Sequence, residues 1–307
     1  MALDAQAKAY LDWLVAAGLR PVETLTPAEA RSQADRHAAD LFGAKEAVDS
    51  VLRTGIDSAR RTDGAGVPVR IYSPSAEPDL PMTVYLHGGG WVLGLVDGFD
   101  GVCRALANRT GCRVVAVDYR LAPEHRFPAA LDDAWAVTRW AFAQAPRVAV
   151  AGDSAGGNLA AVVALRARDA GLPLACQVLV YPVTDHRFDR RSYVDNATGF
   201  GLTEPAMRWF WDQYLGGADG GHPDASPLRA RSLAGVAPAL IVVCEHDPLR
   251  DEGVEFAERL REAGVPVRLS EYAGMVHGFL RMPARIDRSR VALDEIGLTL
   301  RQALDPD

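Results

Sequence analysis

Short apolar runs alternate with longer helical patterns along most of the chain, and this alternation limits the possible folds more than any other feature. The runs, rich in β-branched residues, cover 69–72, 82–87, 113–119, 147–151, 176–181, 239–244 and 267–272, with a further candidate near Val51. The helical patterns cover 129–143, 158–169, 251–263 and a last stretch ending near Leu304. Most runs are too apolar to leave one face of a strand in water. The order strand, helix, strand therefore predicts an α/β protein with a mostly parallel sheet and helices on both faces.

The first 43 residues precede this alternation and are predicted to form two helices. In the first helix, apolar side chains share one face: Leu3, Ala7, Tyr10, Leu11 and Leu14. In the second, Thr26 and Glu29 form a capping-box pattern around Pro27, and the helix stops at Gly43. Because a narrow apolar face suits a helix that covers a pocket, we expect this segment to act as a lid. Ordinary core packing is the alternative.

A second segment, residues 193–216, is longer than a plain crossover between two strands needs. Four of its apolar side chains fall on one helical face, at Met207, Phe210, Trp211 and Tyr214. The same two interpretations apply, a lid over a site or packing in the core. We take Phe210 and Trp211, together with Trp91 from an earlier loop, as candidate substrate-binding residues.

Charge and hydropathy exclude several classes of function. The chain of 307 residues carries a net charge of -7, and among its 33 basic residues only Lys8 and Lys45 are lysines. Because a nucleic-acid interface needs a basic face, we expect no nucleic-acid partner. No apolar run approaches the roughly 18 residues of a membrane span, so no membrane association is expected either.

The cysteines also limit the options. Cys103, Cys112, Cys176 and Cys244 form no C-x-x-C pair, so neither a disulfide scaffold nor a structural zinc site is expected. Nothing in the sequence calls for a metal or another cofactor. Because the N-terminal segment lacks the charged and apolar regions of a secretion signal, we expect a reducing, cytoplasmic location. The oligomeric state stays open, with a homo-oligomer as one alternative.

The segment GDSAGGN (152–158) follows an apolar strand and runs into a helix. In this context G-x-S-x-G is the nucleophile-elbow pattern, in which a strained turn lifts the serine hydroxyl clear of the sheet. Ser154 is therefore the candidate nucleophile. Side chains two positions away would collide in such a turn, which explains Gly152 and Gly156. The five-residue pattern alone is weak, and a glycine-rich packing turn is the alternative.

Three consecutive glycines follow the strand 82–87, within the run HGGGW (87–91). Acyl transfer develops negative charge on an oxygen atom, and unhindered backbone N–H groups can hold that charge. We therefore predict Gly88 and Gly89 as oxyanion donors. The third donor would be the N–H of Ala155, immediately after the nucleophile. Taken alone, the glycines would be read as a flexible turn.

An active serine needs a base, and the base needs an orienting carboxylate. His277 lies in a glycine-flanked loop five residues past the last predicted strand, and the chain order Ser, Asp, His of nucleophile-elbow enzymes requires a late histidine. His37 and His125 precede Ser154, while His222 lies in a Gly/Pro/Asp-rich loop with no strand just before it. His277 is therefore the predicted base, and a solvent-exposed loop histidine is the alternative.

Three aspartates compete for the role of orienting acid. Asp247 lies three residues past the strand 239–244, so its loop should emerge at the carboxyl edge of the sheet, where α/β sites assemble. Asp251, one helical turn further on, is expected to cap or start the helix 251–263. Asp185 follows the preceding strand and remains a rival. Asp247 is the predicted acid, with a structural turn aspartate before Pro248 as the alternative.

Five blocks together resemble the hormone-sensitive-lipase-like family of α/β-hydrolases, which includes bacterial carboxylesterases of the GDSAG type. They are HGGGW, DYRLAPEHRFPAALDD (118–133), GDSAGGN, DPLRDEG (247–253) and GMVHGF (274–279). The resemblance implies the α/β-hydrolase fold, with Ser154, Asp247 and His277 as the catalytic triad. It further implies a two-part helical cap, 1–43 and 193–216, on a catalytic domain spanning 44–307. For DYRLAPEHRFPAALDD it suggests scaffolding beside the oxyanion loop.

The predicted function is hydrolysis of short- to medium-chain carboxylic esters through an acyl-enzyme, with a small-molecule ester as the substrate. An amidase or peptidase on the same scaffold is one alternative. A non-catalytic small-molecule receptor is another, as in the gibberellin receptors that resemble this family. Those receptors lack the histidine, whereas His277 is present here.

Overall fold

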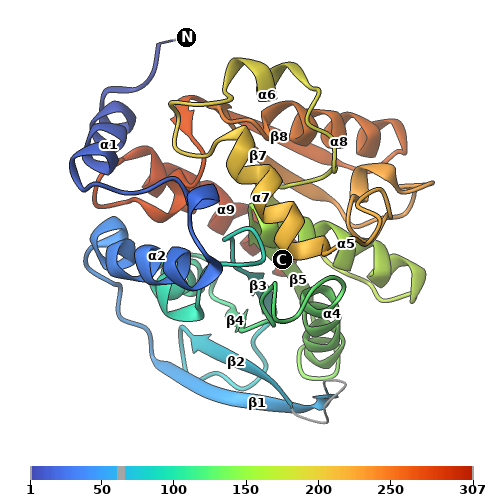
Figure 1. The fold of residues 1–307 in the computed structure, drawn as a ribbon. Coiled ribbons are helices and arrows are strands. Elements are labelled where there is room, and N and C mark those ends of the chain that lie inside the picture. Colours follow the sequence, from blue (N-terminus) through green and yellow to red (C-terminus); the bar gives the residue numbers. More distant parts are fainter. Residues whose placement is uncertain (1, 61–65, 306–307) are drawn as a thin grey trace.

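The computed structural model describes residues 2–60 and 66–305, so residues 1, 61–65 and 306–307 of the predicted domains lie outside the described residues. Its sheet has the strand order β1-β2-β4-β3-β5-β6-β7-β8 (Figure 1). The strands are β1 (Ser50–Arg60), β2 (Gly66–Ser73), β3 (Met82–Leu86), β4 (Arg113–Val117), β5 (Val148–Asp153), β6 (Gln177–Val180), β7 (Ala239–His246) and β8 (Val267–Val276). β2 pairs antiparallel with β1 and β4, and all other pairs are parallel. The predicted α/β fold with a mostly parallel sheet is confirmed.

Helices cover both faces of this sheet and enclose two apolar cores. One face packs against α3 (Asp100–Thr110) and α9 (Arg288–Leu304), the other against α4 (Ala129–Phe142), α5 (Ala155–Asp169) and α8 (Arg250–Glu262). Successive strand residues point to opposite faces, so Val84 joins the core under α4 and α5 while Tyr85 joins the core under α3. Burial on both faces explains why the strands are almost uniformly apolar.

Some element boundaries differ from those predicted. α3 was not predicted, because Gly101 and several polar residues weaken its apolar periodicity; packing against α9 and β4 stabilises this helix instead. β8 continues to Val276, so His277 follows the strand directly rather than after a five-residue loop. The single segment 193–216 divides into α6 (Arg191–Asp195) and α7 (Glu204–Leu215).

The two N-terminal helices are α1 (Ala5–Ala16) and α2 (Pro27–Phe42), and both are capped as their sequences dictate. Asp4 accepts hydrogen bonds from the first backbone N–H groups of α1, and Thr26 and Glu29 form the predicted capping box. Short 3₁₀ turns complete the chain: η1 (Val22–Thr24), η2 (Val96–Phe99), η3 (Pro227–Arg229) and η4 (Phe279–Arg281). No helix among the described residues is long and apolar enough to cross a membrane.

Arg31 fastens α2 to the loop that follows β3. Its Nε donates to the Val92 carbonyl at 2.8 Å, and another of its nitrogens donates to the Ala122 carbonyl at 2.8 Å. The guanidinium also forms a two-pronged ion pair with Glu124. The N-terminal helices are therefore connected directly to the glycine loop of the site.

Candidate active site

Ser154 occupies a sharp turn between β5 and α5. Its backbone has φ 56° and ψ -120°, a conformation that L-residues other than glycine rarely adopt. A Cβ at Gly156 would overlap the Leu86 carbonyl, and one at Gly152 would overlap the Gly156 carbonyl. The two glycines therefore allow α5 to approach β3 closely enough to hold the strained turn. Its strain is typical of a backbone that presents a reactive side chain.

A continuous chain of hydrogen-bonding atoms joins three of the predicted site residues. His277 Nε2 lies 2.9 Å from Ser154 Oγ, and His277 Nδ1 lies 2.7 Å from Asp247 Oδ2. The second carboxylate oxygen of Asp247 accepts the Leu249 backbone N–H at 2.9 Å. Asp247 is fully buried and Ser154 borders a cavity, so this series of contacts runs from the interior to the cavity wall. This geometry can move a proton from Ser154 to His277 while Asp247 holds the imidazole in place.

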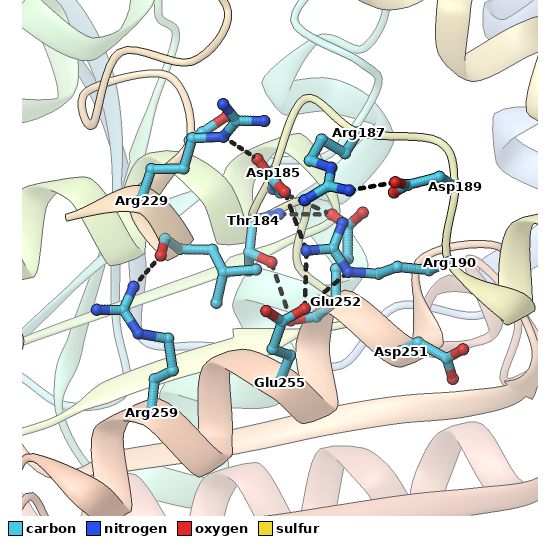
Figure 2. Close-up of polar contacts among 12 residues, drawn as sticks. Thr184, Asp185, Arg187, Asp189, Arg190, Arg229, Asp251, Glu252, Glu255 and Arg259 are labelled. Carbon is cyan, nitrogen blue, oxygen red and sulfur yellow. Dashed lines mark hydrogen bonds and ion pairs between the residues drawn. The ribbon is translucent and has the colours of Figure 1, made fainter.

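The rival aspartates lie elsewhere. Asp185 is bound by two arginines, with Arg190 at 2.9 Å and Arg229 at 2.5 Å (Figure 2). Asp251 accepts the Ser192 backbone N–H at 2.8 Å and so ties α6 to α8. It lies in the first turn of α8, as expected, although it does not cap the helix. Neither carboxylate contacts His277.

Sequence reasoning missed Glu252, which is fully buried in the first turn of α8. Its Oε1 accepts the Thr184 backbone N–H at 2.6 Å (Figure 2). Burial raises the pKa of this carboxyl to about 8. Glu252 lies within the DPLRDEG block, but the sequence gives no sign that its side chain points into the interior.

The glycine loop corrects one predicted oxyanion donor. The Gly88 N–H already donates to the buried carboxylate of Asp153 at 2.9 Å, so it is not available to a substrate oxygen. Gly89 and Gly90 border the cavity beside Ser154 instead. Among the described residues, nothing accepts a hydrogen bond from the N–H groups of Gly89, Gly90 or Ala155. We therefore infer that Gly89 and Gly90, rather than Gly88 and Gly89, are the oxyanion donors of this loop. Three identical residues in a row gave no sign of which two border the cavity.

The DYRLAPEHRFPAALDD block supports this loop, as the resemblance suggested. The Tyr119 hydroxyl donates to the His87 carbonyl at 2.6 Å, and the two rings stack with their centroids 4.2 Å apart. Burial lowers the pKa of His87 to about 4, so this ring is neutral at physiological pH. His87 is therefore a structural support for the glycine loop.

Two adjoining cavities meet at His277. The inner cavity, about 160 Å³, is bordered by Ser154, Gly89, Gly90 and Asp153. The outer cavity, about 470 Å³, is bordered by residues of α1, α2 and α7. Both cavities share a set of lining residues: Leu202, Phe210, His277, Gly278 and Arg281. A substrate could therefore lie across His277, with its ester in the inner cavity.

Of the three predicted substrate-binding residues, only Phe210 borders these cavities. Trp91 and Trp211 are fully buried, and that prediction is wrong for both. Trp91 stacks on Tyr214 with ring centroids 4.2 Å apart and packs against Trp211 at 4.7 Å. These rings attach α7 to the glycine loop, because the apolar face of α7 points into the molecule.

Among residues 2–60 and 66–305, no group of three or more His, Cys, Asp or Glu side chains lies close enough to hold a metal ion.

Comparison with known proteins assigns the family. The family model described as "alpha/beta hydrolase fold" matches residues 83–281, more than half of the chain. The chain belongs to this α/β-hydrolase family, and the predicted hormone-sensitive-lipase-like relationship is confirmed.

Relatives of this chain include ester hydrolases. Carboxylic ester hydrolase LipN of Mycobacterium tuberculosis is 46% identical over 231 residues, which cover 70% of this chain and 61% of LipN. Ethyl acetate hydrolase of Pseudomonas putida is 38% identical over 323 residues, covering 99% of this chain and all of that protein. The predicted carboxylic ester hydrolase activity is therefore confirmed.

Solved structures agree over nearly the whole chain. A thermostable esterase from Pseudomonas putida matches with a TM-score of 0.92 at 36% identity, covering 99% of this chain and 98% of that chain. An ester hydrolase from the Lake Arreo metagenome, complexed with a bipyridine phosphonate derivative, matches with a TM-score of 0.91 at 37% identity, covering 97% and 98%.

Proposed function

We propose that Ser154, His277 and Asp247 hydrolyse short- to medium-chain carboxylic esters through an acyl-enzyme. The observation that carries this proposal is the unbroken contact from Ser154 Oγ through His277 to Asp247 Oδ2, on a strained turn that borders a cavity. A receptor would not need this series of hydrogen-bonded side chains. Receptors of this type lack the histidine, whereas His277 is present here and contacts Ser154.

In the acylation step, His277 Nε2 takes the Ser154 proton while Ser154 Oγ attacks the ester carbonyl carbon. The resulting tetrahedral oxyanion accepts hydrogen bonds from the N–H groups of Gly89, Gly90 and Ala155. The imidazolium then gives its proton to the alcohol oxygen as the carbon–oxygen bond breaks. The alcohol leaves, and the acyl group remains on Ser154.

In the deacylation step, water replaces the alcohol. His277 takes a proton from water, the hydroxide oxygen attacks the acyl carbonyl, and the same N–H groups hold the second oxyanion. Ser154 Oγ leaves with the proton from His277, and the carboxylic acid is released. Asp247 accepts the Nδ1–H bond throughout, which keeps Nε2 directed at Ser154.

We also propose that 1–43 and 193–216 form a two-part cap on the catalytic domain 44–307. This proposal is supported by α1, α2 and α7 together lining the outer cavity next to His277. Removal of 1–43 should change acyl-chain preference by several-fold while the sheet core stays folded. Unchanged kinetics with every ester tested would refute the cap assignment.

For location we propose the cytoplasm, as the four cysteines are buried and free rather than paired. A thiol-trapping experiment on protein isolated from cells should find these cysteines reduced.

The test of the function is a p-nitrophenyl ester series from acetate to palmitate, alongside the matched p-nitroanilides. We expect turnover that is highest for acyl chains of about two to eight carbons, weak or absent amide cleavage, and no turnover by Ser154→Ala. Faster anilide than ester cleavage would favour an amidase. Binding without turnover would favour a receptor.

A further inference from the structure

Arg281 is a cation beside the nucleophile that the proposed mechanism does not use. It follows His277 by four residues, in η4, and borders both the inner and the outer cavity. Its guanidinium forms neither a hydrogen bond nor an ion pair with any residue in the described part of the chain, and its Nε is buried without a partner. The described residues therefore occupy none of the N–H donors of this guanidinium, and the side chain borders both cavities.

The side chain is held in place by an aromatic ring rather than by a carboxylate. The Arg281 guanidinium lies 4.2 Å from the centroid of the buried Phe99 ring. This contact fixes the cation without occupying its N–H donors in the plane of the guanidinium. A positioned but unpaired guanidinium at a cavity wall is suited to bind an anion.

The acids near Arg281 have other partners. Asp153 Oδ1 accepts hydrogen bonds from the Tyr85 hydroxyl and the Gly88 N–H, and Asp247 is bound to His277. The positive charge of Arg281 nevertheless acts on Asp153. Burial raises the pKa of this carboxyl, and the Arg281 charge opposes that rise. Arg281 is thus near enough to act on a charged substrate.

We propose that Arg281 binds a second, ionised carboxylate carried by the ester substrate, which makes hemiesters of dicarboxylic acids and acyloxy acids the favoured class. The inference rests on the proposed function, since the ester group must lie beside Ser154 in the inner cavity. Guanidinium and carboxylate match through two parallel N–H···O bonds. The hydrocarbon between the two groups would pack on apolar residues shared by the cavities, such as Leu202 and Phe210. The second carboxylate can belong to the acyl or to the alcohol part of the ester.

A different role for Arg281 makes a different prediction. If the cation served only to offset the buried charge of Asp153, its removal would disturb the glycine loop through the Gly88 hydrogen bond. Neutral and anionic esters would then lose activity equally. Substrate binding instead predicts a loss that depends on the charge of the ester.

The experiment compares the wild type with Arg281→Met and Arg281→Lys by proton release in a pH-stat. One arm pairs monoethyl adipate and glutarate with ethyl hexanoate and pentanoate, which tests the acyl side. The other pairs 4-acetoxybutanoate with butyl acetate, which tests the alcohol side. The control is Arg285→Met, because Arg285 lies in the same segment and its guanidinium lies 4.0 Å from the Trp13 ring, yet it borders neither cavity.

In at least one arm, Arg281→Met should lower kcat/KM for the anionic ester by about tenfold to a hundredfold through KM, the usual effect of losing a hydrogen-bonded ion pair. The neutral partner should change less than about threefold, Arg281→Lys should retain part of the preference, and Arg285→Met should match the wild type. Equal losses for both esters, or an unchanged ratio in both arms, would overturn the inference while leaving the esterase function intact. Failure of the wild type to hydrolyse any ester would overturn both.

Discussion

Two buried aspartates follow neighbouring parallel strands of one sheet, and only one of them faces the histidine. Asp247 follows β7 and Asp185 follows β6, and the two are 0% and 2% exposed. Asp247 is bound by His277, while Asp185 is bound by two arginines. An arginine stays protonated and cannot act as a base, whereas a neutral histidine can accept a proton. The partner, rather than burial or position along the sheet, separates a catalytic carboxylate from a structural one.

The surroundings of the two aspartates differ in the same way. The Asp185 region is a set of ion pairs and hydrogen bonds that holds the loop after β6 against α8 and η3 (Figure 2). The Asp247 region ends at an accessible hydroxyl beside a cavity. Substitutions in the first region should therefore affect stability, and those in the second should affect turnover.

The largest effect is expected from removing the nucleophile or the base. Ser154→Ala and His277→Ala should each lower kcat by about 10⁴-fold to 10⁶-fold, because triad members act as one unit. The double variant should be little slower than either single variant, with melting temperatures near that of the wild type. Steady-state kinetics and thermal unfolding measure both quantities; losses that multiply independently would argue against a shared mechanism.

Exchange of the two aspartates for asparagine tests the comparison itself. Asp247→Asn should lower kcat by about four orders of magnitude, because the amide stabilises the wrong imidazole tautomer. Asp185→Asn should leave kcat near that of the wild type but lower the free energy of unfolding by about 3 kcal/mol, since it leaves Arg190 buried without its full charge partner. Denaturant unfolding and ester kinetics on both variants decide the matter. The reverse pattern would make Asp185 the acid.

The glycine loop should show a smaller catalytic effect. Gly89→Val should lower kcat by roughly 100-fold or more, the scale of one lost oxyanion donor, because Gly89 has φ 123° and a Cβ there would overlap the Leu93 carbonyl. Gly88→Val should also reduce activity, but through Asp153, whose Oδ2 would lie 2.5 Å from the new Cβ. Pairing each with Asp153→Asn separates the two: the Gly88 loss should be largely non-additive with it and the Gly89 loss additive. Full activity in Gly89→Val would remove this loop from the oxyanion site.

The smallest catalytic effect is expected at Glu252, which belongs to the Asp185 region. Burial raises its pKa from an ordinary 4.5 to about 8, so the folded protein keeps a proton that the unfolded chain releases. The free energy of unfolding should therefore fall as pH rises from about 4.5 to about 8, where a pKa difference of one is worth about 1.4 kcal/mol. Glu252→Gln cannot ionise and should flatten this slope without changing kcat by more than about twofold. Parallel slopes for both proteins in unfolding measured at pH 5, 6.5 and 8 would show that Glu252 is already ionised when folded.

The sequence was enough to predict the alternation of strands and helices, the mostly parallel sheet and the three residues now found in contact. Each follows a strand end, and parallel strands bring those ends to one edge of the sheet. It could not distinguish Gly88 from Gly90, because only the folded structure brings the Asp153 carboxylate to the Gly88 N–H. Nor could it show that Trp91 and Trp211 point inward, since only tertiary packing brings Trp91 against Trp211 and Tyr214 of α7.

Asp185 shows a further limit. Its two arginines come from positions 5 and 44 residues away, and nothing in the local sequence marks either as its partner. Arg281 was missed for a related reason, because a single arginine after GMVHGF has no signal until the cavities around it are known.

The central claim, that Ser154 forms a covalent intermediate under the control of His277 and Asp247, is tested most directly by labelling with a p-nitrophenyl alkylphosphonate. Peptide mass spectrometry and the rate of p-nitrophenol release report the site and speed of the reaction. The account predicts one phosphonyl group per chain, on Ser154, formed at the wild-type rate in Asp185→Asn and far more slowly in Asp247→Asn. A label on any other residue, or equal labelling rates in the two asparagine variants, would contradict it.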